Sequence, residues 1–173
     1  MRYPALLCGI AAIALAMSAC RQSPPVPAAA VPDTHNSDIK AITEDEVQWN
    51  NDWAARDGAK VLGHYAEDAI LMAPGMEALK GREAIKGGID GMLADKALSL
   101  KFKAANVIVS TAGDLAYTQG NYTMTMTDPG THKVMNDHGN YVTTYRKQAD
   151  GSWKAVADIA TSAVPPAAPK HKG

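Results

Sequence analysis

The sequence predicts an α+β domain in which helices lie against one face of an antiparallel sheet. Two observations lead to this prediction. Apolar residues recur every three or four positions in stretches between residues 38 and 94, which is the period of one helix face. From residue 98 to residue 162, apolar and polar residues instead alternate in runs separated by turn residues, which is typical of consecutive antiparallel strands. Helices first and a meander of strands afterwards is the α+β pattern.

Three helices are predicted. The first runs from the Ser37-Asp38 pair, either residue of which can cap it, to Trp53. Asp57-Gly58 breaks this helix, residues 59–65 form a short second helix, and residues 81–94 form the third. Apolar stripes support the first and third helices: Ile39, Ile42, Glu46, Trp49 and Trp53 in one, and Ile85, Ile89, Met92 and Leu93 in the other.

The predicted sheet begins with a short strand at residues 69–72, after a turn at residues 66–68. Longer strands follow at residues 98–110, 115–127, 134–147 and 153–162. The last two form a hairpin, residues 139–162, because Asp150-Gly151 supplies a tight turn between runs of β-branched and aromatic residues. Tyr141, Thr143 and Tyr145 share one face of this hairpin. An isolated hairpin is only marginally stable in water, so the other strands and a covering layer of helices must complete it.

Residues 1–19 are predicted to be a lipoprotein signal peptide. A positive charge precedes a short apolar run, and Met17-Ser18-Ala19-Cys20 resembles the bacterial lipobox, in which cleavage exposes a cysteine that is then acylated. An ordinary secretory signal with a chance cysteine is the alternative. With Arg21 rather than an aspartate after Cys20, the resemblance implies a lipid-anchored protein of the bacterial cell envelope, on the outer membrane and facing the periplasm.

The remaining chain divides by composition. Residues 20–37 are rich in Pro and Ala and are predicted to be an extended tether. Residues 38–163 are long enough for one hydrophobic core and form the predicted domain, and residues 164–173 are predicted to be a disordered tail.

Composition excludes several classes of function. Of the two cysteines, Cys8 lies in the predicted signal and Cys20 would be acylated, so no thiol remains for catalysis or a disulfide. The five histidines are widely separated, and no phosphate-binding loop or Gly-x-Ser-x-Gly motif is present, so we predict no metal and no cofactor. The formal net charge is −1, and removing residues 1–19 removes only Arg2, which gives −2. This balance is not typical of a nucleic-acid-binding protein.

The order of four motifs resembles the nuclear transport factor 2-like superfamily. Within it, the motifs are similar to the SnoaL-like or ketosteroid-isomerase-like domains, and to a domain of unknown function that is common in secreted bacterial proteins. The motifs span residues 53–69, 81–85, 116–122 and 146–154. The resemblance covers nearly all of residues 38–162. It implies a curved sheet wrapped by three helices into a cone, an apolar cavity open at one end, and frequent homodimers through the outer sheet face. Such a fold hosts many functions and does not by itself assign one.

Ketosteroid-isomerase chemistry requires a carboxylate base and a hydrogen-bond donor for the developing oxyanion. The resemblance places the base at Ala73 and the donor tyrosine at Trp49. Alanine cannot accept a proton, and an indole N–H can donate a hydrogen bond but cannot accept one. The sequence therefore favours a protein without this isomerase activity.

Candidate site residues follow from the expected cavity. Its wall is predicted to include eight residues: Trp49, Trp53, Tyr65, Met72, Met76, Gln119, Tyr141 and Asp158. Asp158 and His138 are the candidates for catalysis, although Asp158 shares strand parity with Lys154 and would then face solvent, and His138 lies near a strand start. Glu46 could be the exposed edge of its helix.

Three functions are left open, in order of preference. The first is a lipid-anchored protein that binds a small, mainly apolar molecule without chemistry. The second is a SnoaL-like isomerase, cyclase or hydrolase that uses Asp158 or His138. The third is a dimeric interaction module whose cavity is filled by its own side chains.

Overall fold

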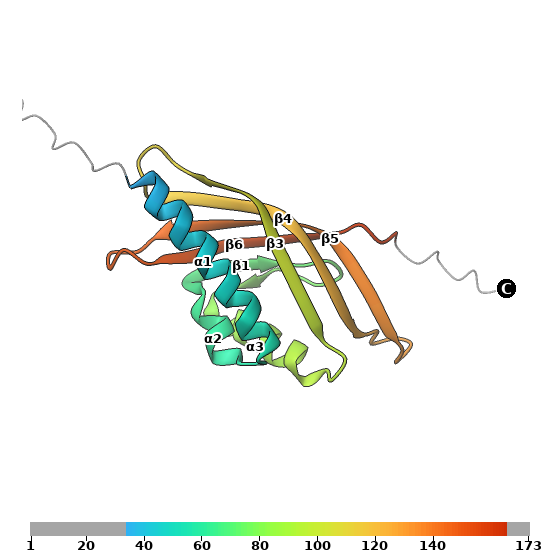
Figure 1. Ribbon diagram of the computed structural model, residues 1–173. Coiled ribbons are helices and arrows are strands. Elements are labelled where there is room, and N and C mark those ends of the chain that lie inside the picture. Colours follow the sequence, from blue (N-terminus) through green and yellow to red (C-terminus); the bar gives the residue numbers. More distant parts are fainter. Residues whose placement is uncertain (1–33, 166–173) are drawn as a thin grey trace, which may run out of the picture. The chain divides into compact units, whose positions relative to one another are not determined.

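A six-stranded curved sheet with three helices against one face forms the domain in the computed structural model, which describes residues 34–165 (Figure 1). The predicted α+β class is confirmed. The predicted signal peptide, Cys20, most of the tether and most of the C-terminal tail lie outside the described residues. Nothing in the described residues is a helix long and apolar enough to cross a membrane.

The helices are α1 (His35–Ala54), α2 (Gly58–Gly63) and α3 (Arg82–Ala94). Helix α1 starts before the predicted Ser37-Asp38 cap, so the last predicted tether residues are helical. Helix α2 begins where the side chain of Asp57 accepts a hydrogen bond from the backbone N–H of Lys60, at 3.1 Å. It ends two residues before its predicted end, because Tyr65 already belongs to a strand.

The strands are β1 (Tyr65–Met72), β2 (Leu79–Lys80), β3 (Ser99–Val109), β4 (Leu115–Thr127), β5 (Val134–Lys147) and β6 (Trp153–Ser162), in the order β2-β1-β6-β5-β4-β3. Strands β3 to β6 form the predicted antiparallel meander. Strand β1 pairs in parallel with β6, and the short strand β2 was not predicted. The turn predicted at residues 66–68 is wrong, since these residues form an irregular part of β1 where its register against β6 shifts.

The core lies between the helices and the inner face of the sheet. The predicted stripes of α1 and α3 are confirmed as buried at Ile42, Trp49, Ile85 and Ile89. Asn50 fixes α1 across β3, because its side-chain amide both donates to and accepts from the backbone of Phe102, each at 2.9 Å. Figure 1 shows α1 running alongside β3.

Two glycines leave room for two tyrosine rings on the inner face of the sheet. Gly120 pairs with Tyr141, and Gly139 pairs with Tyr122, across β4 and β5. A Cβ at Gly120 would lie 2.0 Å from the backbone oxygen of Lys103, and a Cβ at Gly139 would meet the neighbouring strand as closely. Only glycine allows this close approach, and each tyrosine ring then lies over its partner glycine.

Candidate functional site

An apolar cavity of about 140 Å³ lies between the helices and the inner face of the sheet. Six of its wall residues are aromatic: Trp49, Trp53, Tyr65, Phe102, Tyr122 and Tyr141. The exposed residues Pro74 and Met76 also line it, which places its opening beside the loop after β1. This volume holds roughly one six-membered ring or a short aliphatic chain.

The structure brings six of the eight predicted wall residues around this cavity: Trp49, Trp53, Tyr65, Met76, Tyr141 and Asp158. It places Gln119 elsewhere, because this residue is exposed and pairs with the outward-facing Val142. Met72 pairs with the exposed Ile159, and its neighbour Leu71 lines the cavity instead. The register shift near the start of β1 decides that Leu71, and not Met72, faces the cavity. The predicted strand of four residues did not include this shift.

Asp158 is the carboxylate of the cavity wall. Its two carboxylate oxygens accept hydrogen bonds from the Tyr65 hydroxyl at 2.7 Å and the Thr143 hydroxyl at 3.1 Å. Burial raises the pKa of Asp158, these two hydrogen bonds oppose the shift, and the charge of Glu46 adds to it. A carboxyl with a raised pKa in an apolar cavity can pair with a cation, donate a hydrogen bond when protonated, or exchange a proton with a ligand.

A bulge in β6 explains why Asp158 points inward. Thr144 pairs with Ala157, but the next residue, Tyr145, pairs with Ala155, so Val156 is an extra residue on β6. The inward parity therefore changes between Lys154 and Asp158. The alternative that Asp158 faces solvent together with Lys154 is wrong for this reason.

His138 lies away from the cavity. It is exposed on β5 and alternates with the buried Asp137 and Gly139. The structure therefore does not bring the two catalytic candidates, His138 and Asp158, into one site.

Glu46 is also an inward-facing carboxylate and is only 4% exposed, so the alternative that it is an exposed helix edge is wrong. It accepts hydrogen bonds from the hydroxyls of Tyr141 at 2.8 Å and Tyr145 at 3.1 Å. Burial, followed by the charge of Glu46, raises the pKa of both tyrosines. Both phenols therefore stay protonated and hold Glu46 behind the cavity wall.

Asp137 is a third inward carboxylate, and sequence reasoning missed it. It accepts hydrogen bonds from the Tyr122 hydroxyl at 2.7 Å and the Ser162 hydroxyl at 2.5 Å. The signal was present, because Asp137 has the same strand parity as Tyr141 on β5.

His64 forms a buried ion-pair cluster on the other side of Trp49, and sequence reasoning missed this cluster too. Its Nδ1 lies 2.9 Å from Asp45 and its Nε2 lies 2.9 Å from Asp52, while its ring stacks on Trp49 with centroids 5.0 Å apart. Burial lowers the pKa of His64, but the hydrogen bonds to the two carboxylates outweigh it and raise the pKa. Because both nitrogens face carboxylates, the imidazolium has no lone pair for a metal. The seven-residue spacing of the two aspartates on one helix was the available signal.

Comparison with known proteins decides the family. Residues 47–156 match the family model of the SnoaL-like domain. The chain belongs to this SnoaL-like domain family. Curated protein sequences yield no match.

Solved structures similar to this SnoaL-like domain share its fold. A ketosteroid isomerase-like protein from Erwinia carotovora atroseptica has 22% identity, covers 75% of this chain and 99% of its own, and has a TM-score of 0.66. An NTF2-like protein with a cystatin-like fold from Novosphingobium aromaticivorans has 22% identity, coverage of 76% and 86%, and a TM-score of 0.62. At these identities the likeness concerns the fold alone.

In this SnoaL-like domain, the positions that the isomerase resemblance assigned to base and donor both line the cavity, as Ala73 and Trp49. Ala73 offers only a methyl group. Trp49 is 3% exposed, and its Nε1–H has no hydrogen-bond partner among residues 34–165. A buried N–H without a partner is costly.

Proposed function

We propose that this SnoaL-like domain binds a small, mainly apolar molecule with one polar end, without converting it. The observation that carries the proposal is the aromatic cavity whose wall holds one carboxylate, Asp158, fixed by Tyr65. The apolar wall favours burial of a ring or alkyl chain, and the few polar groups orient it. The methyl group at Ala73 leaves the isomerase base position without a proton acceptor.

The size of the cavity limits the ligand. A volume of about 140 Å³ fits roughly one ring, so a multi-ring molecule would extend past Met76 into solvent. A one-ring ligand has few atoms, and even the best small ligands gain no more than about 1.5 kcal/mol per non-hydrogen atom. For a ring with about seven such atoms this limit is roughly 10 kcal/mol, so we expect its dissociation constant to lie no lower than about 10⁻⁸ M.

Proton transfer by Asp158 is the second candidate function. A carboxyl of raised pKa beside a tyrosine hydroxyl in an apolar cavity favours it. Turnover would then depend on pH, and Asp158→Asn would abolish it. Turnover that survives this substitution would exclude Asp158 as the acid or base. His138 is exposed and does not line the cavity, so we do not expect it to replace Asp158.

We further propose that the domain is anchored to the cell envelope by lipid on Cys20. The lipobox-like Met17-Ser18-Ala19-Cys20 and the Pro- and Ala-rich stretch after it support this proposal. Palmitate labelling should disappear in Cys20→Ser. Labelling that persists in this variant would contradict the anchor.

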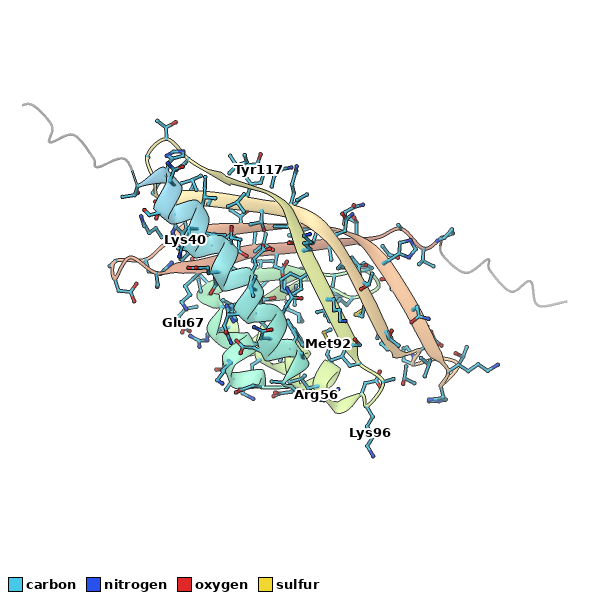
Figure 2. All side chains as sticks on the ribbon, in the orientation of Figure 1. Lys40, Arg56, Glu67, Met92, Lys96 and Tyr117 are labelled. Carbon is cyan, nitrogen blue, oxygen red and sulfur yellow. The ribbon has the colours of Figure 1, made fainter. Side chains whose placement is uncertain are left out.

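A homodimer through the outer sheet face belongs to the same proposal. Ile108 pairs with Tyr117, and Val142 pairs with Ile159, so four exposed apolar side chains lie in two adjacent cross-strand rows. Figure 2 shows Tyr117 on the side of the sheet away from the helices. Apolar patches of this kind are typical of protein interfaces.

Blocking the cavity tests the binding function. Ala160→Phe places a ring into the cavity from β6, whereas Thr161→Phe places the same ring on the exposed face one residue later. Neutral, cationic and anionic single-ring compounds are titrated while the indole N–H signals of Trp49 and Trp53 are followed by NMR. We expect some compounds to shift these signals in the wild type and in Thr161→Phe but not in Ala160→Phe. If no compound shifts them in the wild type, the proposal fails.

A further inference from the structure

The cavity wall has few free hydrogen-bond donors. Each of its three tyrosine hydroxyls already donates to an inward-facing carboxylate: Tyr65 to Asp158, Tyr122 to Asp137 and Tyr141 to Glu46. The Thr143 hydroxyl also donates to Asp158. The phenolic oxygens and the carboxylate remain available only as acceptors. Among the described wall residues, Trp49 Nε1–H is the one buried side-chain donor without a partner.

The charges around the cavity are predominantly negative. No Lys, Arg or His is among the cavity-lining residues in the described range 34–165. Asp158 lines the cavity, and Glu46 and Asp137 are each one tyrosine side chain behind it. His64, which stacks on Trp49 behind the wall, faces two carboxylates of its own. An anionic ligand would meet repulsion here and find almost no donors.

Aromatic rings enclose the same space. Trp49 meets Tyr65 and Phe102 edge to face, with centroids 5.0 Å and 5.6 Å apart, and Phe102 meets Tyr141 in the same way at 5.7 Å. Aromatic ring faces attract cations, most strongly where water is excluded, and a cluster of rings with a carboxylate is well suited to an ammonium group.

We propose that the ligand of this cavity is a small organic cation, an amine with a single ring or short alkyl chain, whose ammonium group pairs with Asp158. The inference rests on the proposed binding function and names its ligand class. The ammonium N–H groups find acceptors in Asp158 and the phenolic oxygen of Tyr65, and the apolar part packs against the rings. The raised pKa of Asp158 is consistent with a carboxyl that lacks its cationic partner when the cavity is empty.

A neutral alcohol would also find acceptors in this wall, so the test must separate charge from donor capacity. Benzylammonium, benzyl alcohol and benzoate have nearly the same size and differ in charge. Each is titrated at pH 7.5 into the Cys20→Ser full-length protein, with dissociation constants from calorimetry and the Trp49 indole signal as the reporter of location. The same titrations are made on Asp158→Asn and Asp158→Ser. Asp68→Asn is the matched control, because Asp68 pairs with Arg146 at the surface.

We expect benzylammonium to bind roughly tenfold more tightly than benzyl alcohol, because charge-assisted hydrogen bonds are stronger than neutral ones. Benzoate should not bind. The ratio of the benzylammonium affinity to the benzyl alcohol affinity should fall to about one in Asp158→Asn and Asp158→Ser. It should stay near tenfold in Asp68→Asn. In the wild type it should also fall as acid protonates Asp158, a readout that does not depend on any variant folding.

Other outcomes overturn the inference. If benzyl alcohol binds as tightly as benzylammonium, or if the preference survives in both Asp158 variants, the cation assignment is wrong while the binding function stands. If no compound shifts the Trp49 signal, the proposed binding function fails as well.

Discussion

The hydroxyl of Tyr65 donates a 2.7 Å hydrogen bond to Asp158, which joins the start of β1 to the middle of β6 at the cavity wall. Tyr65 is 3% exposed, and burial followed by the Asp158 carboxylate raises its pKa well above the usual value. The phenol therefore stays protonated and keeps the carboxylate in place. This pair is the polar centre of an otherwise apolar site.

Tyr65→Phe should destabilise the domain by about 1–2 kcal/mol at pH 7, because an ionised Asp158 loses a donor. The pKa of Asp158 is already raised in the folded state, so stability falls as pH rises from 3.8 through that folded value. Without the Tyr65 hydroxyl, this decrease of the unfolding free energy with pH should be larger. Tyr65→Phe should therefore be less destabilised, relative to the wild type, at pH 4 than at pH 7. Urea unfolding at both pH values checks this. Tyr117→Phe, at an exposed position, should change stability by less than about 0.5 kcal/mol at either pH.

His64 should also make stability fall as pH rises, but in a higher pH range than Asp158. Its folded pKa is raised, so its contribution is fully present below pH 6.5 and is lost as pH rises through the folded pKa. His64→Gln should remove this loss from the unfolding free energy measured between pH 6 and 9. His138→Gln, at an exposed position, should leave it unchanged. Equal pH profiles for the wild type and His64→Gln would contradict the ion-pair cluster.

Glu46→Ala should cost about 2–4 kcal/mol, because two buried phenols, Tyr141 and Tyr145, lose their acceptor. Guanidinium unfolding measures the loss. The matched control is Glu44→Ala on the same helix, where the side chain is 64% exposed and pairs only with Lys40. This control should cost less than about 0.5 kcal/mol. Similar losses in the two variants would mean that the buried contacts of Glu46 contribute little.

Tyr117→Lys should convert the proposed dimer to a monomer, because it places a charge in the apolar rows of the outer face. Sedimentation equilibrium gives the mass. Val47→Lys is the control, since Val47 is also an exposed hydrophobic residue, at 59%, but lies on α1. A monomeric wild type, or a dimer that survives Tyr117→Lys, would contradict the interface.

The sequence predicted the elements better than it predicted the site. The stripe of α1 repeats over many residues, so the face that carries Trp49 could be assigned. The alternation of β4 and β5 separates their two faces but does not say which one is inward, and Gln119 was placed on the wrong one. The alternation of inward and outward residues is interrupted wherever a strand gains an extra residue, as β6 does at Val156. This single bulge decides that Asp158 faces the cavity. No local pattern announces such a bulge.

Contacts between residues far apart in the chain also could not be predicted from the sequence. Glu46 is separated by about a hundred residues from the tyrosines that hydrogen-bond to it, and its burial depends on their hydroxyls arriving at the same point. In isolation a glutamate on a helix edge favours solvent. The buried cluster of His64 is similar, because its two aspartates are visible in the sequence but the position of the ring between them is not.

The most direct test of the binding function is native mass spectrometry of the Cys20→Ser protein purified gently from the periplasm. We predict a reproducible extra mass that is lost on denaturation, is retained in Thr161→Phe and is absent from Ala160→Phe. If the same extra mass appears on Ala160→Phe, or if the wild-type cavity carries none, the cavity is not the site of a resident small molecule.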